Sequence, residues 1–482
     1  MRWEDLKQDI KNFLFEFRRQ KIGIMGVILL VILLVIAIFA PVIATEGAKD
    51  NWRNMAYWDE NPADAPPAWM NYFTGKDMSP HIIMDTYDEK IEDLGGGIKR
   101  DELTFNYDYK YDVPPTDLTF KAELIYYNAA KPPSINMVLL RPDGNTIKLY
   151  SKPSKTGKSE EDHYVAEVNV LVSASDTAKK EAYNFGREFE TKDNLKKILS
   201  ADFVDPMSVI FSKTEPGILL EEADSLKGNY KLIVDIYYFD KRDSTRSAKS
   251  VFAGKVYGLL GTDSNRRDLF KGVVWGTRWA LALGLLTAVF SVGIGIAFGI
   301  TSAYLGGWKD EFMQRINEAV ASLPFLPILI LISAVFKPSI WNIIILMSLL
   351  FWTGTAKVAR SMGLQIKEET YIEAARCLGA GNRRIILRHM IPQVMPYAFA
   401  NMALSVPNAL LTEAGLSFLG LGDTTVITWG QILYGAQTAG ATLRGLWWWV
   451  VPPGLAIAIV GLTFVMIGTA LDTVLNPKMK RM

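Results

Sequence analysis

The sequence TYIEAARCLGAGNRRIILRHMIP, residues 370–392, contains the most informative local pattern in the chain. Thr370 and Glu373 have the spacing of a capping box, and the alanines that follow favour a helix. Gly379 stands where a left-handed residue ends a helix, and Asn382 can cap a second helix. The stretch therefore predicts two short helices joined by a tight turn.

The second of these helices, residues 383–391, is basic. Arg384 and Arg388 are one helical turn apart and share a face. A short amphipathic hairpin with small alanines can lie in a groove of a partner protein. The hairpin is therefore a candidate docking element.

Long apolar segments lie on both sides of this hairpin. Residues 22–44 carry no charge, and at ~1.5 Å per residue such a helix crosses a ~30 Å hydrocarbon core. This run is longer than the core of a signal peptide, so we expect an uncleaved membrane anchor. Five more spans are expected after residue 273, at 275–304, 316–336, 340–358, 391–416 and 447–471. The sequence therefore predicts an α-helical membrane protein with six transmembrane helices.

Basic residues indicate the orientation of these spans, because cytoplasmic loops are enriched in Lys and Arg. They precede the first span, occupy the loop 367–392 and follow the last span: Lys7, Lys11, Arg18, Arg19, Lys21, Lys367, Arg376, Arg383, Arg384, Arg388, Lys478, Lys480 and Arg481. We therefore expect a cytoplasmic N-terminal segment, residues 1–21, and a cytoplasmic C-terminus in the cell membrane. Lys357 and Arg360, at the end of the fourth span, are interpreted as snorkelling to lipid phosphates.

Between the first two spans, residues 45–262 form a polar insert that this topology places outside the cell. Apolar and polar residues alternate in three stretches, which predicts half-buried strands at 118–127, 164–172 and 230–238. Residues 141–144, Arg-Pro-Asp-Gly, have turn chemistry suited to joining two strands. We expect a β-rich extracellular domain, a β-sandwich, with a helical stretch at 175–200 and a loop at 61–67.

Composition excludes several classes of function. The chain has 482 residues, a formal net charge of +1 and no basic stripe outside the membrane flanks, which argues against nucleic-acid binding. Its single cysteine, Cys377, permits no intrachain disulfide. No metal-ligand spacing appears, and the three histidines are too scattered for a catalytic set, so we expect no metal, no catalytic residue and no enzyme activity.

The hairpin sequence resembles the EAA loop of ABC importer permeases through Glu373-Ala374-Ala375, Gly379 and Pro392. Other blocks agree in order: residues 261–263 and 267–268 resemble GTD…GRD, residues 304–308 read YLGGW, and residues 413–422 read EAGLSFLGLG. From about residue 260 onward the chain resembles the dipeptide and oligopeptide permease subfamily of the DppC and OppC type. It departs from that pattern by Arg266 in place of a glycine, by His389 and Ile391, and by the large insert.

This resemblance implies a type I ABC importer permease fold over residues 263–482, with the loop 367–392 seated on an ATPase. The residues implied to couple to the ATPase are Glu373, Ala374, Ala375, Gly379, Arg383, Arg384, Arg388 and Pro392. The implied partners are a second permease subunit, two ABC ATPase subunits and an extracellular solute-binding protein. No cofactor belongs to this chain, because ATP and Mg would bind the ATPases.

The translocation path or gate is expected at Glu413, Ser417 and Phe418. A carboxylate within a membrane span is costly, so substrate contact is one interpretation of Glu413. A structural hydrogen-bonding or gate-packing role is the other, and we favour it.

Peptides are the cargo that the resemblance implies, but two rival functions fit the sequence. One is an importer of oligosaccharides or another small solute, because no binding pocket can be identified from the sequence. The other is a membrane receptor with an extracellular ligand-binding domain, which predicts no ATPase partner and leaves the hairpin unexplained. A proton-driven carrier would need inverted repeats or several buried acids.

Overall fold

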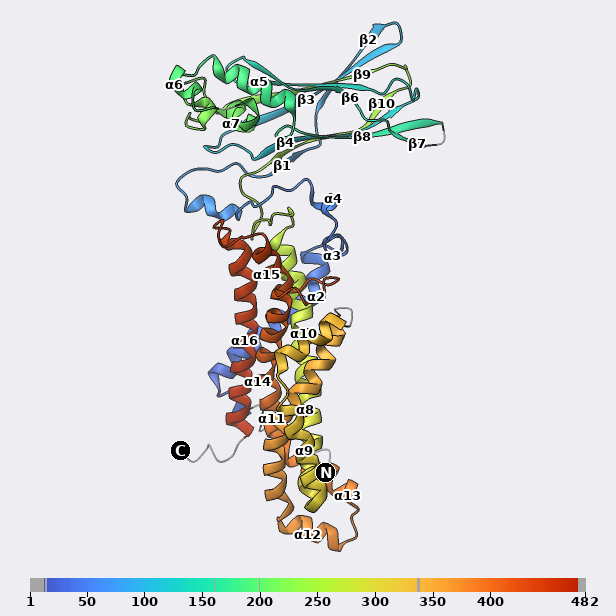
Figure 1. Ribbon diagram of the computed structural model, residues 1–482, viewed down its shortest axis with the longest axis vertical. Helices are drawn as coiled ribbons and strands as arrows, with labels where there is room; N and C mark the ends of the chain where they lie inside the picture. The colour runs from blue at the N-terminus through green and yellow to red at the C-terminus, as the bar shows by residue number, and fades with distance from the viewer. Residues whose placement is uncertain (1–12, 14, 161, 199, 336–338, 476–482) are drawn as a thin grey trace. The chain divides into compact units, whose positions relative to one another are not determined.

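The computed structural model describes residue 13 and residues 15–160, 162–198, 200–335 and 339–475. Several basic residues used above for orientation lie outside these ranges, namely Lys7, Lys11, Lys478, Lys480 and Arg481. The chain divides into two compact units, a helical one from Met1–Arg53 with Leu269–Met482 and a β-rich one from Asn54–Asp268 (Figure 1).

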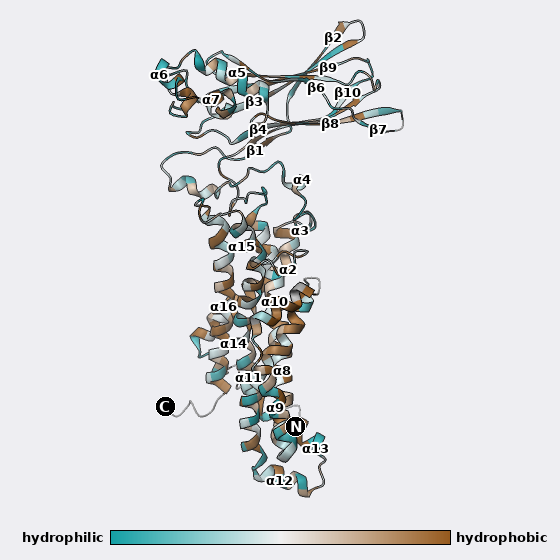
Figure 2. Ribbon diagram, in the orientation of Figure 1, coloured by the Kyte–Doolittle hydropathy of each residue, from teal (hydrophilic) through white to brown (hydrophobic). Residues whose placement is uncertain are grey.

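Within the described part of the first unit, four helices are long and apolar enough to cross a membrane, and Figure 2 shows them largely in hydrophobic colours. They are α2 (Lys21–Ile43), α8 (Leu269–Leu305), α11 (Ile340–Lys367) and α16 (Trp447–Leu475). A further long helix, α14 (Ile391–Phe418), packs against both α8 and α16, and α16 packs against α2. The helical membrane architecture expected from the sequence is therefore present.

The closest helix contact, between α8 and α11, depends on glycine. A Cβ built on Gly299 would lie 2.3 Å from the carbonyl oxygen of Ala356, and one on Gly363 would lie 2.8 Å from the Cβ of Ala303. Small residues let two helix backbones approach closely, which is how membrane helices gain packing energy.

The expectation of one continuous span over residues 316–336 is wrong. The structure has α9 (Gly307–Ala321), a break, and then α10 (Phe325–Val335). Pro324 lies in this break and disfavours a helical conformation at the residue before it, so the helix ends at that point. At ~1.5 Å per residue, α10 rises only about 16 Å, roughly half of a hydrocarbon core.

The β-rich unit contains two five-stranded antiparallel sheets. One has the order β1 (Ile82–Met84), β10 (Ser244–Ala253), β4 (Asp117–Tyr126), β8 (His163–Leu171) and β7 (Lys158–Glu160). The other has the order β2 (Asp88–Gly95), β3 (Ile98–Tyr109), β9 (Gly228–Tyr238), β5 (Ser134–Leu140) and β6 (Thr146–Pro153). Figure 1 shows the sheets as two layers. The predicted β-sandwich is confirmed.

One apolar core joins the two sheets. It contains alternate residues of strands from both layers, such as Phe105 of β3 and Phe120 of β4, neither of which is exposed. The rings of Tyr107 and Phe252 stack with their centroids 4.0 Å apart. Aromatic side chains contribute large buried areas, so a core of this composition stabilises the sandwich without a disulfide.

Short helices close one end of the sandwich: α5 (Asp176–Arg187), α6 (Lys192–Leu195) and α7 (Pro206–Phe211). The helical prediction for 175–200 is thus correct for α5 and α6, which are separated by a short connection. The turn expected at residues 141–144 joins β5 to β6, with Gly144 at φ +83°.

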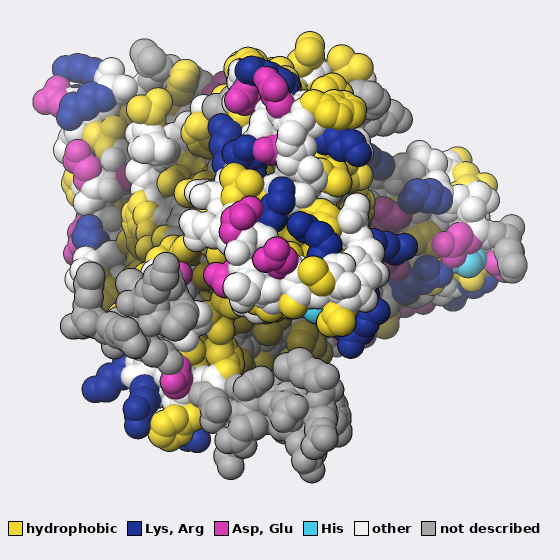
Figure 3. Space-filling view, turned by 90° about the horizontal axis from the view of Figure 1, so that it is seen from below, with side chains coloured by type: hydrophobic (Ala, Val, Ile, Leu, Met, Phe, Trp, Pro, Cys, Tyr) yellow, Lys and Arg dark blue, Asp and Glu magenta, His cyan; other side chains and the backbone are white. Residues whose placement is uncertain are grey.

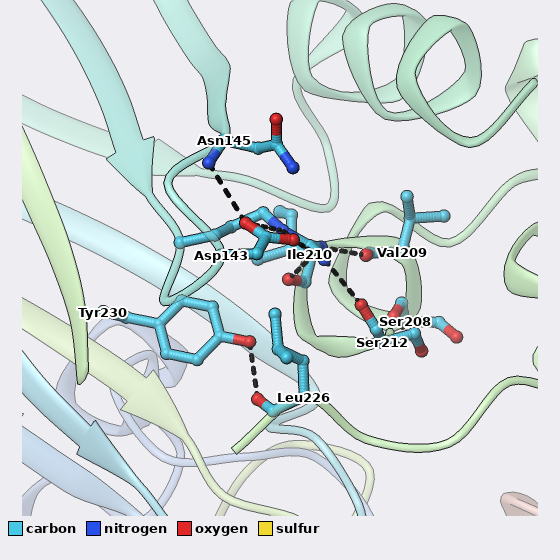
Figure 4. Close-up of polar contacts among 9 residues, drawn as sticks. Asp143, Asn145, Ser208, Val209, Ile210, Ser212, Leu226 and Tyr230 are labelled. Atoms are coloured by element: carbon cyan, nitrogen blue, oxygen red, sulfur yellow. Dashed lines mark hydrogen bonds and ion pairs between the residues drawn. The ribbon is translucent and has the colours of Figure 1, made fainter. Parts of the chain in front are cut away.

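Arg141 of that turn is almost fully buried and holds α7 in place. Figure 4 shows its partners Asp143, Val209, Ile210 and Ser212 close together. Its guanidinium donates to the carbonyl oxygens of Val209 (2.8 Å), Ile210 (2.7 Å) and Ser212 (2.7 Å) at the end of α7. It also forms an ion pair with Asp143, to which one terminal N–H donates at 2.9 Å and the Nε–H at 3.2 Å. All five N–H donors of the side chain are thereby used, and the unpaired carbonyls at the end of α7 are satisfied.

The β-rich unit begins and ends later than the expected limits of 45 and 262. Residues before 54 pack with the membrane helices instead, because the indole of Trp52 lies against Gly272 and the carbonyl of Thr45 accepts a hydrogen bond from Trp275. Other short helices in the chain are α3 (Glu46–Asp50), α4 (Met55–Trp58), η1 (Ala68–Tyr72), η2 (Ala201–Phe203), η3 (Ile218–Leu220) and α15 (Trp429–Thr438).

Arg266, which stands where the resemblance leads one to expect glycine, has φ +64°. That conformation favours glycine, so an arginine there is strained. Its guanidinium donates to the carbonyl oxygens of Asp59 and Asn61, both at 3.0 Å. These bonds offset the strain, and they explain how the departure from the pattern is tolerated.

Candidate functional site

The hairpin forms as predicted, with two short helices joined by a tight turn. The first helix is α12 (Thr370–Cys377), and the second begins as α13 (Asn382–Ile385) and continues through a π turn into α14. Gly379 adopts φ +80°, and the N–H of Ala380 donates to the carbonyl of Ala375 at 3.0 Å. This is the left-handed helix stop that the sequence indicates.

The predicted caps of both helices are wrong. The cap position of α12 is Glu369, one residue before the predicted Thr370, and no side chain bonds there; only two residues separate α12 from the end of α11 at Lys367. Asn382 is the first residue of α13, and its side-chain oxygen accepts a hydrogen bond from the Tyr304 hydroxyl at 2.9 Å. Glu373 is left exposed, with no hydrogen-bond or ion-pair partner among the described residues.

Two apolar side chains anchor the hairpin to the membrane helices. Ile372 and Ile385 are fully buried in a cluster with Ile300, Tyr304 and Val394. The guanidinium of Arg376 also lies over the Tyr304 ring, 5.7 Å from its centroid. The hairpin is therefore held on one face.

The opposite face is free among the described residues and mixes apolar with basic side chains. Ala374, Gly379 and Pro392 are exposed, Ala375 is half-buried, and the arginines predicted to couple are all exposed: Arg383, Arg384 and Arg388. Leu378 is 88% exposed and Leu387 is 53% exposed. Figure 3, seen from the end of the membrane unit that carries α12, shows hydrophobic and basic side chains side by side.

Leu378 is a residue that sequence reasoning missed. It lies directly before the turn glycine, where a leucine is as compatible with burial as with exposure. The α-helical period could have identified Leu378, because this residue does not share a helix face with the buried Ile372. An exposed leucine beside basic residues is typical of a protein contact surface.

A partly buried ion pair supports the helices that carry the hairpin. Asp310 of α9 accepts hydrogen bonds from Arg360 of α11 at 2.8 and 2.6 Å and a further bond from Ser302 of α8. The interpretation of Arg360 as snorkelling is therefore wrong, because its guanidinium is engaged by a carboxylate. Bidentate Arg–carboxylate pairs constrain geometry strongly, so α8, α9 and α11 are tied together.

The residues expected on the translocation path lie apart from the hairpin and in two different environments. Glu413 is 6% exposed and accepts hydrogen bonds from the hydroxyls of Ser417 (2.7 Å) and Thr428 (2.8 Å). Ser417 is fully buried, whereas Phe418 is 41% exposed. The carboxylate is therefore engaged in internal packing.

Two glycines next to Ser417, Gly422 of the loop after α14 and Gly430 of α15, explain how this cluster closes. A Cβ on Gly422 would lie 1.9 Å from Ser417 Oγ, and one on Gly430 would lie 2.6 Å from Ser417 Cβ. Any side chain at either position would push the loop away from Ser417, so the loop approaches the helix only with glycine there.

The chain is similar in sequence to known transport proteins. Residues 295–481 match the family described as binding-protein-dependent transport system inner membrane component, and residues 10–67 match the N-terminal TM domain of oligopeptide transport permease C. The Bacillus subtilis dipeptide transport system permease protein DppC is 34% identical over 46% of this chain and 69% of its own length. The chain belongs to the dipeptide and oligopeptide permease family of ABC transporters.

A second relative agrees with this family assignment. The Haemophilus influenzae oligopeptide transport system permease protein OppC is 34% identical over 46% of this chain and 71% of its own length. A solved structure of the MetNI methionine ABC transporter is 17% identical with a TM-score of 0.34, and covers 42% of this chain and 96% of that one. Permeases of this family are integral membrane subunits of transporters, not enzymes themselves.

Proposed function

We propose that this permease imports dipeptides or oligopeptides into the cell as one subunit of an ABC importer. The observation that carries the proposal is its identity of 34% with dipeptide and oligopeptide permeases over about two thirds of their length. A hairpin that is anchored on one face and exposed on the other supports the same function, because such an element suits contact with a separate subunit.

The proposed complex contains a second permease subunit, two ABC ATPase subunits and an extracellular solute-binding protein that delivers the cargo. ATP and Mg bind the ATPases in this proposal, and the permease contributes no cofactor. Membrane lipid surrounds the apolar helices.

In the proposed mechanism the hairpin transmits movement of the ATPases to the membrane helices. Its exposed residues, including Glu373, Leu378 and Arg384, would lie on the ATPase. Ile372 and Ile385 would pass the movement to α8 and α14, and the Asp310–Arg360 pair would carry it to α9 and α11. The helices then change from an outward-open to an inward-open arrangement.

The proposed topology has six crossings: the four helices of sufficient length and hydropathy, α14, and the broken segment that α9 and α10 form together. Both termini and the loop 367–392 lie in the cytoplasm in this proposal, and the β-rich domain, residues 54–268, lies outside. We assign the outer domain to contact with the solute-binding protein or the partner permease. Glu413, Ser417 and Phe418 are assigned to packing at the gate.

Binding-protein-dependent uptake by the reconstituted complex tests this function. Peptides of two to six residues and a matched set of oligosaccharides would be offered to the same vesicles. ATP-dependent uptake of peptides alone is expected. Uptake of oligosaccharides in their place would refute the cargo, and failure to co-purify with any ATPase would favour the receptor function instead.

A further inference from the structure

Helix α14 has a stripe of polar and small residues along one face, although most of the helix is apolar. Asn401, Ser405, Asn408, Thr412 and Gly415 recur at intervals of four, three, four and three residues. That spacing places them on one face of a helix. A stripe without large apolar residues in a membrane helix indicates a face that does not contact lipid chains.

Most of the polar groups on this stripe are satisfied within the protein. The Asn401 amide donates to the Thr355 hydroxyl at 2.9 Å, and the hydroxyls of Ser405 and Thr412 donate to main-chain carbonyls one turn earlier at 2.7 Å. Asn408 differs, because its side-chain amide is exposed and has no hydrogen-bond partner among the described residues. An amide without a hydrogen-bond partner is unfavourable in hydrocarbon, so Asn408 requires a polar partner.

The same face lines an open hollow of about 650 Å³. Ser405, Asn408, Thr412 and Gly415 form one wall, and residues of α10 and α11 form the others, among them Phe325 and Phe351. No charged side chain lines it among the described residues. A volume of this size, with apolar walls and a few polar groups, falls in the range of ligand-binding sites.

We infer that this hollow contacts the peptide during transport and that Asn408 binds its main chain. The inference rests on the proposed function. An amide side chain donates and accepts hydrogen bonds as a peptide group does, and the aromatic walls accept apolar side chains. A lining without charge does not select for the charge of the cargo. The path residue is thus Asn408, whereas Glu413, five positions later, faces the packed cluster with Ser417 and Thr428.

The Asn408→Asp variant tests direct contact, because it keeps the size of the side chain and adds a negative charge. Neutral, lysine-containing and aspartate-containing tripeptides would be compared in reconstituted complexes. The ratio of acidic to basic peptide uptake is expected to fall at least about fivefold, since like charges repel in a site of low dielectric. Misfolding lowers all three rates together, so a change in the ratio reports contact. An unchanged ratio overturns the inference.

A second variant tests whether the hollow must stay open. Gly415→Trp adds a large ring at a position where a Cβ meets nothing within 4 Å. Gly293→Trp in α8 is the matched control, because Gly293 is also within a helix, exposed and without neighbours, but does not line the hollow. Uptake is expected to fall more than tenfold in Gly415→Trp and to stay near the wild-type rate in Gly293→Trp.

Three outcomes separate this inference from the proposed function. A wild-type complex that imports no peptide refutes the proposed function. Normal uptake by Gly415→Trp, with wild-type transport intact, refutes the inference alone. Loss of the partner permease from the purified Gly415→Trp complex also overturns it, because the hollow would then be filled by that subunit.

Discussion

Gly379 determines the geometry of the hairpin turn through its backbone alone. It has φ +80°, and a Cβ there would meet no atom within 4 Å, so replacement strains the chain without a clash. Left-handed backbone costs a residue with a side chain about 1–2 kcal/mol. Gly379→Val is therefore expected to misplace α12 and to lower ATPase co-purification and uptake, while membrane abundance stays normal.

Two variants control this prediction. Gly381→Val should be tolerated, because Gly381 is equally open but has φ −69° and ψ 157°, which suits valine. Gly379→Asn should retain more activity than Gly379→Val, since asparagine accepts left-handed backbone. Normal uptake in Gly379→Val would contradict the coupling role of the hairpin.

Glu413 provides a test of structural against substrate-binding roles. Glu413→Gln keeps an oxygen that accepts from Ser417 and Thr428, whereas Glu413→Leu leaves two buried hydroxyls without an acceptor. The leucine variant should lose about 1–3 kcal/mol of stability, and the glutamine variant much less. Thermal unfolding of the detergent-purified protein measures both. Equal stability with an altered cargo preference would favour the substrate-binding role.

His81 makes the β-rich domain sensitive to acid. Burial lowers the pKa of His81 to about 4, with the charge of Glu60 acting in the opposite direction. Both ring nitrogens are buried without a hydrogen-bond partner. Because the folded pKa is below the ordinary value of 6.5, protonation favours unfolding. The contribution of His81 to the free energy of unfolding is therefore highest above pH 6.5 and falls by roughly 2–3 kcal/mol as the pH is lowered toward 4.

The free energy of unfolding in urea is measured for the wild type and for His81→Gln at pH 7 and at pH 4.5. Buried acids such as Asp205, whose pKa burial raises, have the opposite dependence and act equally in both proteins. The difference between the two proteins therefore isolates the histidine. A wild type that loses no more stability than His81→Gln would contradict this assignment.

At the scale of elements, the sandwich should fold without the membrane helices, because its core lies between its own two sheets. Residues 54–268 expressed alone are expected to unfold cooperatively with a β-type circular dichroism spectrum. Arg141→Met should remove about 2–4 kcal/mol, since the carbonyls at the end of α7 lose their donor and Asp143 its partner. Arg242→Met, at an exposed pair with Asp240, should change the stability far less, because water and salt screen exposed ion pairs.

The elements that the sequence predicted correctly are those with a strong local signal. Strict alternation identified β4, β8 and β9, and a glycine with no alternative role identified the turn at Gly379. The break at Pro324 was not predicted because hydropathy is averaged over a window of residues. A single proline changes that average little when its neighbours are apolar. The cap predictions failed because both helices begin one residue earlier than the capping patterns indicate, with Glu369 and Gly381 at the cap positions.

Site residues were harder to predict than elements for a physical reason. Glu413 attracted attention as a charge in a span, but its partners Ser417 and Thr428 become neighbours only after the loop folds back through Gly422 and Gly430. Asn408 carries no charge, so its importance appears only when the hollow beside it is known. A sequence pattern indicates how unfavourable a residue is in lipid. The fold determines which groups satisfy that residue.

At the scale of the whole molecule, the single cysteine makes the topology testable. Native Cys377 is exposed at the end of α12 and should react with an impermeant maleimide only after the membrane is opened. In a Cys377→Ser background, Lys155→Cys and Leu443→Cys should react in intact cells, and Arg383→Cys should not. Labelling of Cys377 or Arg383→Cys in intact cells would invert the proposed orientation.

The first and last strands of the sandwich, β1 and β10, are hydrogen-bonded neighbours, with Ile82 opposite Phe252. The segments leading in and out are also joined, because Ala68 N–H donates to the Gly258 carbonyl and Thr262 N–H to that of Ala65. A domain whose two ends are adjacent can be gained or lost in a single genetic event without separating α2 from α8, which pack together. Such a domain behaves as a cassette, so permeases with and without it can descend from one ancestor through a change in one loop.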